Sequence, residues 1–323
     1  MKYNLKKWAG LSLMMVLLPS IGLMSCSDDK SDEPINKAQS SIKFVTEDYG
    51  TDFGDEVESV ALYVFDDKGL FVKVFEDSGD RLSKEGYTLS IDGLKPGTYS
   101  CVAWCGLKND DDRKADFTVS DMKEGVSTRS DLLCRMAVKS VDGEDQCSAD
   151  LNDLFFGSLE GMVISDKNDA EAPLYTVNLI QDTKEVEVIL TDVPDITSLN
   201  AADYTFTYTD NNAVLGYDNC PVGESKVVYL PYSVEEKKLD GDKENSVVAK
   251  FKVNRLMTDS EGIIVVTDNR SQDKMIARIP LVDIILSRTQ YKHPVSGLQI
   301  WEQDVLDLYN EFSLKLYYDD FKN

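Results

Sequence analysis

Short apolar runs separated by polar turns recur along most of the chain. The first six are residues 60–65, 70–75, 87–91, 99–104, 175–180 and 186–190. Five more follow at residues 204–208, 226–230, 247–253, 263–267 and 275–279. They are rich in β-branched and aromatic residues, which predicts strands. Because no long helical pattern lies between them, the sequence predicts an all-β fold of antiparallel sandwiches.

Turn sequences support this interpretation. Residues 66–69 (DDKG) separate two apolar runs, as the loop of a hairpin does. In residues 95–97 (KPG), the proline fixes φ and the glycine allows positive φ, which is typical of a turn.

A polar stretch, residues 165–172 (SDKNDAEA), precedes Pro173 and a second series of strands. A chain of this length is expected to form two domains. The sequence therefore predicts an N-terminal β-sandwich over residues 41–172 and a C-terminal β-sandwich over residues 173–323, each with its own two-sheet core.

The end of the chain changes its periodicity. A helix covering a sheet edge is predicted by apolar residues spaced three and four apart, namely Leu298, Trp301, Val305, Leu308 and Phe312. A final strand is predicted by alternation at Phe312, Leu314, Leu316 and Tyr318. This strand either packs on its own domain or pairs with another subunit, and in the second case these four residues are candidate partner-strand contacts.

The beginning of the chain has the pattern of an export signal. Three lysines precede an apolar run over residues 8–24, and Ser25-Cys26 follows directly. This pattern predicts a lipoprotein signal peptide, residues 1–25, with Cys26 lipidated after cleavage. A plain secretory peptide and a short anchoring helix are the alternatives. Residues 26–40, polar and acidic, predict a flexible tether. The acidic cluster behind Cys26 also resembles the export signal of surface lipoproteins of the Bacteroidetes, which implies a surface-exposed position on the outer membrane.

The net charge of −24 makes nucleic acid an unfavourable partner, because such binding requires lysine and arginine to neutralise phosphates. Apart from Cys26, the five cysteines are Cys101, Cys105, Cys134, Cys147 and Cys220. Cys101 and Cys105 lie about 13 Å apart if they share a strand, which excludes a direct bridge. Pairing of either one with Cys134 or Cys147, and buried free thiols, remain equal alternatives.

Few residues indicate catalysis. His293 is the only histidine, and its neighbours Lys292 and Pro294 indicate an exposed turn. The sequence has no glycine-rich phosphate loop, HExxH or GxSxG motif, so we expect no catalytic residues and no cofactor.

Two acidic loops could supply oxygen ligands to calcium: residues 109–112, and a second loop with Asp210, Asn211, Asn212, Asp218 and Asn219. Neither has the regular ligand order of a calcium loop, so solvated turns are the favoured interpretation and no metal is predicted. Trp104 and Trp301 could form a glycan platform, although Trp104 lies within a strand pattern and is expected in the core.

Several segments together resemble the FimB family of fimbrial anchoring subunits, the lipoproteins at the base of type V pili of the Bacteroidetes. In chain order they are KPGTYSCVAW (95–104), LFFG (154–157), residues 204–210, VYLPY (228–232), NRL (254–256) and IPL (279–281). Cys101 and Cys105 depart from the residues expected around the first segment. The resemblance covers nearly all of the chain that would remain after cleavage.

This resemblance implies two transthyretin-like sandwiches, attachment to the outer membrane through lipid on Cys26, and a fimbrial stalk subunit (pilin) as the partner. It also implies that the protein limits fimbrial length. Related stalk pilins lose their leader and first strand to an arginine-directed protease. Here no arginine occurs between Cys26 and Arg81, which favours an anchor that stays attached. A surface glycan-binding lipoprotein and a lipidated stalk or tip pilin are the alternatives.

Overall fold

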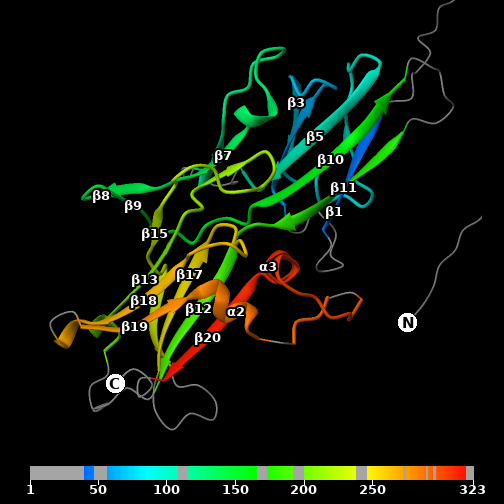
Figure 1. Ribbon diagram of the computed structural model, residues 1–323. Coiled ribbons are helices and arrows are strands. Elements are labelled where there is room, and N and C mark those ends of the chain that lie inside the picture. The colour runs from blue at the N-terminus through cyan, green and yellow to red at the C-terminus, as the bar shows by residue number, and fades with distance from the viewer. Residues whose placement is uncertain are drawn as a thin grey trace, which may run out of the picture. The chain divides into compact units, whose positions relative to one another are not determined.

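The computed structural model describes residues 40–46, 57–107, 115–165, 173–191, 200–237, 246–271, 274–288, 290–293 and 296–317. These residues belong to one compact unit, Ala38–Asn323, built mainly of strands with two short α-helices (Figure 1). No helix within the described ranges is long and apolar enough to span a bilayer. The predicted all-β fold is confirmed.

The N-terminal part contains a seven-stranded sheet. Its strand order is β3 (Phe71–Ser78), β2 (Ser59–Phe65), β5 (Gly97–Cys105), β10 (Phe155–Ile164), β11 (Leu174–Gln181), β1 (Ser41–Thr46) and β4 (Leu89–Ser90). All seven residues of β2 are buried, because its two faces contribute to two different hydrophobic clusters. This is why the sequence of β2 is a continuous apolar run rather than an alternating one.

The seven-stranded sheet folds over on itself between β10 and β11. These strands pair only at Phe155–Gln181 and Phe156–Ile180. Beyond this corner, a Cβ atom added at Gly157 would lie 2.5 Å from the carbonyl oxygen of Asn178, so only glycine allows the two strands to approach so closely. Side chains from β2, β5 and β10 on one side and from β1 and β11 on the other share one buried cluster, which makes this part a sandwich.

The β2–β3 hairpin forms where the DDKG turn predicts it. The Asp66 carboxylate accepts hydrogen bonds from the backbone N–H groups of Lys68 and Leu70, both at 2.9 Å. Gly69 has a φ of 75°, a conformation that glycine adopts without strain. The local sequence therefore determines this turn.

Two further sheets form the C-terminal sandwich. One has the order β16 (Ser233–Lys237), β17 (Ser246–Val253), β12 (Lys184–Thr191) and β20 (Glu311–Tyr317). The other has the order β19 (Lys274–Pro280), β18 (Ile263–Asp268), β13 (Tyr204–Asp210), β15 (Val227–Tyr229), β9 (Glu144–Cys147) and β8 (Lys139–Val141). Apolar side chains of both sheets belong to one buried cluster. The helices α2 (Leu281–Leu286) and α3 (Gln303–Leu308) add buried residues to it.

Strands from the two halves of the chain pair with each other. β9 pairs in parallel with β15, and β7 (Leu133–Met136) pairs with β14 (Val214–Gly216). β6 (Phe117–Val119) completes the three-stranded sheet that contains β7 and β14. Trp104 of β5 and Phe206 of β13 also belong to the same buried cluster. The two halves therefore share both backbone pairing and a hydrophobic core.

All eleven runs predicted as strands coincide with strands of the structure, within a few residues at their ends. The pairing is less uniform than the predicted antiparallel arrangement, because β1–β11, β9–β15 and β12–β20 are parallel. β11 continues the N-terminal sheet beyond the boundary expected at residues 172/173. The division into two domains itself stays a prediction.

The C-terminal helix is shorter than its periodicity predicted. α3 contains Val305 and Leu308, whereas Leu298 and Trp301 lie before it with 70% and 59% of their surface exposed. Phe312 belongs to β20. The spacing of these apolar residues predicted one helix with a continuous apolar face, but the chain forms a loop, a short helix and a strand.

Because the halves share a core, we expect them to unfold together. Phe206→Ala, in the C-terminal half, removes a side chain that is 99% buried and should cost about 3–5 kcal/mol. In a protein that starts at residue 26 and carries Trp301→Phe, Trp104 is the one remaining tryptophan. Its fluorescence, which reports on the N-terminal half, and far-UV circular dichroism should then shift to the same lower urea midpoint. Val163→Ala, at an exposed position, is the control and should change stability by less than about 0.5 kcal/mol. A Trp104 transition that Phe206→Ala leaves in place would contradict this expectation.

Candidate functional site

The first strand of the chain, β1, lies in the interior of the N-terminal sheet. It pairs in parallel with β11 over six residues, from Ser41–Leu174 to Thr46–Leu179, and with the short strand β4 on its other side. Ile42 is fully buried and Phe44 is 4% exposed. Removal of β1 would therefore expose the backbone edge of β11 and part of the core beneath it.

The first arginine of the chain lies well beyond this strand. Arg81 follows β3 in a turn, where its side chain is 67% exposed and forms an ion pair with Asp77. No arginine lies between Cys26 and this position. A protease that cuts only after arginine therefore has no site that would separate β1 from the chain before it. Cys26 itself lies outside the described residues.

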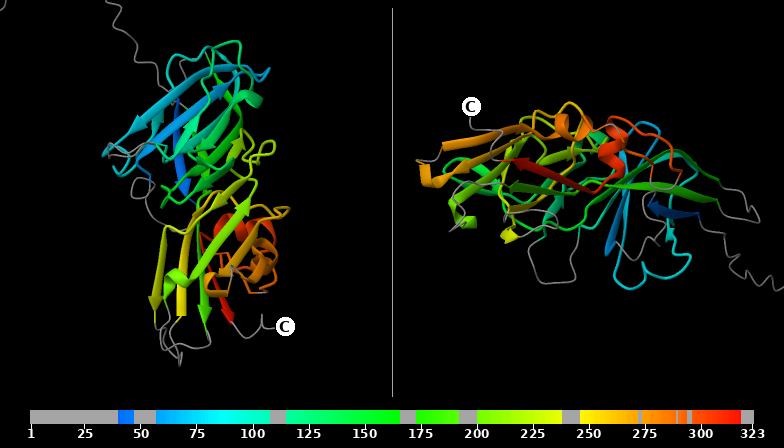
Figure 2. Two further views of the ribbon diagram at one scale, coloured as in Figure 1. Left: turned by 90° about the vertical axis from the view of Figure 1, so that its left-hand side faces the viewer. Right: turned by 90° about the horizontal axis from the view of Figure 1, so that it is seen from below.

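The last strand, β20, occupies one edge of the four-stranded sheet, beside β12 (Figures 1 and 2). Three of the four predicted contact residues are buried in the chain's own core: Phe312 is 4%, Leu314 2% and Leu316 9% exposed. Tyr318 lies outside the described residues. The predicted strand is present. Within the described part of the chain, no strand pairs with the backbone edge of β20 that faces away from β12. Contact with a partner strand stays a prediction.

A charged cluster lies where the chain passes from β11 into β12. The guanidinium of Arg255 contacts Asp182 at 3.0 Å and Asp307 of α3 at 2.9 Å. Asp182 is fully buried and also accepts a hydrogen bond from Asn219 Nδ2 at 2.8 Å. Burial raises the pKa of Asp182, although Arg255 opposes that shift. The cluster thus joins the link between the halves to the end of β17 and to α3.

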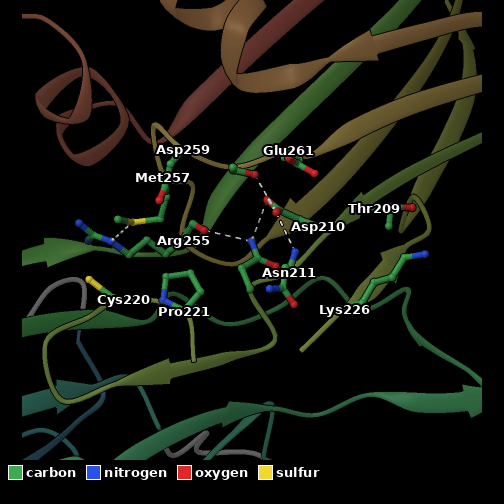
Figure 3. A pocket seen from close by; sticks show the side chains of 12 residues that line it. Thr209, Asp210, Asn211, Cys220, Pro221, Lys226, Arg255, Met257, Asp259 and Glu261 are labelled. Carbon is green, nitrogen blue, oxygen red and sulfur yellow. Dashed lines mark hydrogen bonds between the residues drawn. The ribbon is translucent and has the colours of Figure 1, made fainter. Parts of the chain in front are cut away.

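One side of Arg255 lines a cavity of about 500 Å³. Figure 3 shows Met257 and Cys220 near Arg255, with Lys226 and Thr209 on the other side of the view. The carboxylate of Asp210, also at the cavity, accepts hydrogen bonds from the Tyr208 hydroxyl, the Ser260 hydroxyl at 2.7 Å and the Asn211 backbone N–H at 2.7 Å. These donors give Asp210 a structural role in holding the loops around the cavity.

The second acidic loop is more buried than a solvated turn. Asn212 is 1% exposed, and its Nδ2 donates to the backbone oxygens of Asn254 at 3.1 Å and Arg255 at 3.0 Å. Its Oδ1 accepts from the Tyr229 hydroxyl at 2.7 Å. The interpretation of this loop as solvated is wrong for Asp210, Asn212 and Asn219, which are at most 8% exposed, whereas Asn211 and Asp218 are exposed as expected. In the described ranges, no three His, Cys, Asp or Glu residues converge as metal ligands would.

The remaining candidates are scattered. Trp104 is fully buried, as expected, and contacts Phe156 edge-on with ring centroids 4.9 Å apart. His293 lies in a loop, where its Nδ1 accepts from the Ser296 backbone N–H at 3.1 Å. Residues 109–112, the first acidic loop, fall outside the described ranges. Cys101, Cys105, Cys134, Cys147 and Cys220 are all free thiols. Of the two alternatives for the cysteines, the structure shows free thiols, and all but Cys220 are buried.

Sequence reasoning missed the buried polar residues around the β11–β12 connection. Gln181, Asp182, Thr183 and Lys184 are consecutive polar residues, all at most 8% exposed. Such a run ordinarily indicates a surface turn, so sequence alone offered no signal for its burial. Two of their partners, Arg255 for Asp182 and Asn310 for Lys184, lie more than 70 residues later in the chain.

Solved structures share this fold. A candidate polysaccharide-binding protein from Bacteroides thetaiotaomicron is 24% identical, with a TM-score of 0.73, covering 87% of this chain and 91% of that one. A candidate adhesin from Bacteroides ovatus is 21% identical, with a TM-score of 0.70 and 91% of each chain covered. The fimbrial anchor protein Mfa2 from Porphyromonas gingivalis is 19% identical, with a TM-score of 0.65, covering 87% and 90%. No curated protein matches the sequence.

The fold thus places this chain in an all-β class of proteins that these solved structures share. Residues 29–310 match the family described as fimbrillin-A associated anchor proteins Mfa1 and Mfa2. Because this match spans most of the chain, the protein belongs to that family. The predicted resemblance to fimbrial anchoring subunits is confirmed.

We expect Arg255 to be essential for stability. Arg255→Met leaves two carboxylates without their shared partner, one of them fully buried, and should lower the free energy of unfolding by about 3–5 kcal/mol. Arg81→Met is the control, because the Arg81 side chain is 67% exposed and water screens its charge, so its ion pair with Asp77 should contribute less than about 1 kcal/mol. Urea denaturation of both variants measures the difference. Equal losses in the two variants would show that burial of the cluster does not matter.

Proposed function

We propose that this protein is a surface lipoprotein that anchors the base of a fimbria to the outer membrane and limits the length of the filament. Membership of the fimbrial anchor family supports this role. Attachment through lipid on Cys26, the surface position and the limit on length are parts of the proposal, as is a fimbrial stalk subunit as the partner.

The observation that carries the proposal is the position of β1. The strand is paired on both sides, its residues Ile42 and Phe44 are buried, and no arginine lies between it and Cys26. A chain that keeps its first strand also keeps whatever is attached at Cys26. Several acyl chains at this cysteine would provide stable membrane attachment, where one chain would not.

The free edge of β20 is the proposed contact with the stalk subunit. The Glu185 backbone N–H donates to the carbonyl oxygen of Asn310 at 2.8 Å, which defines the side of the strand that faces β12. Because backbone groups alternate along a strand, those of Glu311, Ser313, Lys315 and Tyr317 point toward the open edge. An added strand would pair with these groups, and the strand's own apolar side chains would stay in the core.

Glycan binding is the second candidate function, and one observation favours it: the side chain of Trp301 is 59% exposed. Among the described aromatic residues, only Trp301 and Tyr317 are counted as exposed. Retention on polysaccharides that Trp301→Ala abolishes would support this function. A processed stalk or tip pilin would instead be shown by a native N-terminus downstream of β1.

Cys26→Ala tests the attachment. The variant should release both the protein and its filaments into the medium, because no acyl chain would hold them at the membrane. Ser27→Ala is the control and should leave both on the cells. Immunoblotting of cell and medium fractions measures the protein, and electron microscopy counts the filaments. Filaments that remain on cells of the Cys26→Ala strain would refute the lipid anchor.

Ser313→Pro tests the open edge of β20. Proline removes an N–H that faces away from β12, so we expect the fold to be kept while binding of the stalk subunit falls at least about tenfold. Ser313→Ala keeps the N–H and should bind normally. Surface plasmon resonance with purified stalk subunit measures the affinity, and circular dichroism checks the fold. Unchanged binding by a folded Ser313→Pro variant would place the contact elsewhere.

A further inference from the structure

A lysine and an asparagine face each other where the first and last strands of the four-stranded sheet begin. Lys184, at the start of β12, is 1% exposed, and Asn310, just before β20, is 9% exposed. Lys184 Nζ lies 2.9 Å from Asn310 Oδ1 and 3.1 Å from the carbonyl oxygen of Asp307. The amine is therefore in direct contact with the amide group.

The backbone holds this pair in register. β12 and β20 pair in parallel from Glu185–Glu311 onward over seven residues, and Lys184 and Asn310 come immediately before the first pair. The hydrogen bond from Glu185 N–H to the Asn310 carbonyl oxygen, 2.8 Å long, closes the ladder at this point. Two side chains held opposite each other on neighbouring strands lose little further freedom when they react.

Neighbouring groups determine the orientation of the Asn310 amide. Its Nδ2 donates to Gln181 Oε1 at 2.7 Å, and Gln181 Nε2 donates to the carboxylate of Asp153 at 2.8 Å. Asp153 also forms an ion pair with Lys252 at 2.6 Å, so it is an ionised carboxylate that accepts hydrogen bonds and donates none. This series of bonds directs Nδ2 away from Lys184 and presents the carbonyl side of the amide to the amine.

A buried carboxyl group lies close in sequence to the pair. Asp182 precedes Lys184 by two residues, is fully buried and interacts electrostatically with Lys184. Its burial raises its pKa, whereas its interactions with Arg255, Asn219 and Lys184 lower it. A group of this kind can pass a proton between an amine and a departing amide nitrogen. Asp182 would act as a positioning group, through its electrostatic interaction with Lys184.

We propose that Lys184 and Asn310 become joined by an intramolecular amide bond. Lys184 Nζ loses a proton and attacks Cγ of Asn310, so the Nζ–Cγ bond forms and the Cγ–Nδ2 bond breaks. Nδ2 takes up the two protons that Nζ loses and leaves as ammonium, so atoms and charge balance. No oxidant, reductant or further reactant is consumed. The product links β12 to β20 covalently and closes a ring over residues 184–310.

This inference does not depend on the proposed anchoring function. The bond would tie the open-edge strand β20 to the sheet, so that β20 could not separate from β12 even after the hydrogen bonds of the ladder broke. Like a disulfide, the bond would stabilise the fold by restricting the unfolded chain, but reductants would not break it.

Peptide mapping of the full-length native protein, denatured and reduced before digestion, tests the proposal directly. The expected result is a branched peptide that contains Lys184 and Asn310 and weighs about 17 Da less than its two parts together, with fragment ions that locate the link. Recovery of the two peptides unlinked and at full mass in most molecules would overturn the proposal. If Lys184 and Asn310 are joined only by a hydrogen bond, the two peptides will be recovered unlinked.

Two variants provide matched controls. Lys184→Arg keeps a buried cation and hydrogen-bond donor but should yield no branched peptide. Asn310→Asp should form the same bond with loss of water, about 18 Da, and so give a product identical in mass to that of the wild type. The peptide maps of the wild type and of Asn310→Asp can be interpreted without the Lys184→Arg variant. The test therefore remains valid even if Lys184→Arg does not fold. A branched peptide that persists in Lys184→Arg would contradict the assignment.

Discussion

The fold depends on a charged cluster that is buried where the chain leaves its first sandwich and enters its second. Arg255 lies between Asp182 and Asp307, and each of the three comes from a different part of the chain. Charges so far from water are tolerated only when they are paired and hydrogen-bonded, because each unpaired one carries the full cost of its desolvation. The cluster therefore requires the β11–β12 connection, the end of β17 and α3 to assemble together.

The same connection organises both ends of the chain. β11 and β12 are consecutive, and β1 pairs in parallel with the first while β20 pairs in parallel with the second. Under the proposed function, lipid is attached ahead of β1 and the stalk subunit binds β20. The segment from β11 to β12 is then a route that connects the two terminal strands, because β1 is hydrogen-bonded to β11 and β20 to β12. Buried polar contacts at its midpoint, among them those of Gln181 and Lys184, hold that route together.

Strands with a strong apolar pattern were predictable and those with a weak one were not. β2 and β5 are buried along most of their length, and their sequences accordingly contain continuous apolar runs that are easily recognised. β8 and β9 are mostly exposed and polar, and glycines interrupt β10 at two positions, so these strands carry no clear alternation. For the candidate site, the final strand and the absence of an early arginine were predictable. The burial of Phe312, Leu314 and Leu316 within the chain itself was one of two open alternatives.

The sequence by itself determined the all-β class, the positions of the main strands, the turn at residues 66–69 and the family resemblance. These features follow from neighbouring residues, through side-chain alternation and the φ preferences of glycine and proline. Only the tertiary structure decided the parallel pairing of the terminal strands, the contacts between halves and the burial of the polar run from Gln181 to Lys184. Each of these depends on residues far apart in the chain, such as Lys184 and Asn310, whose proximity arises only when the sheets assemble.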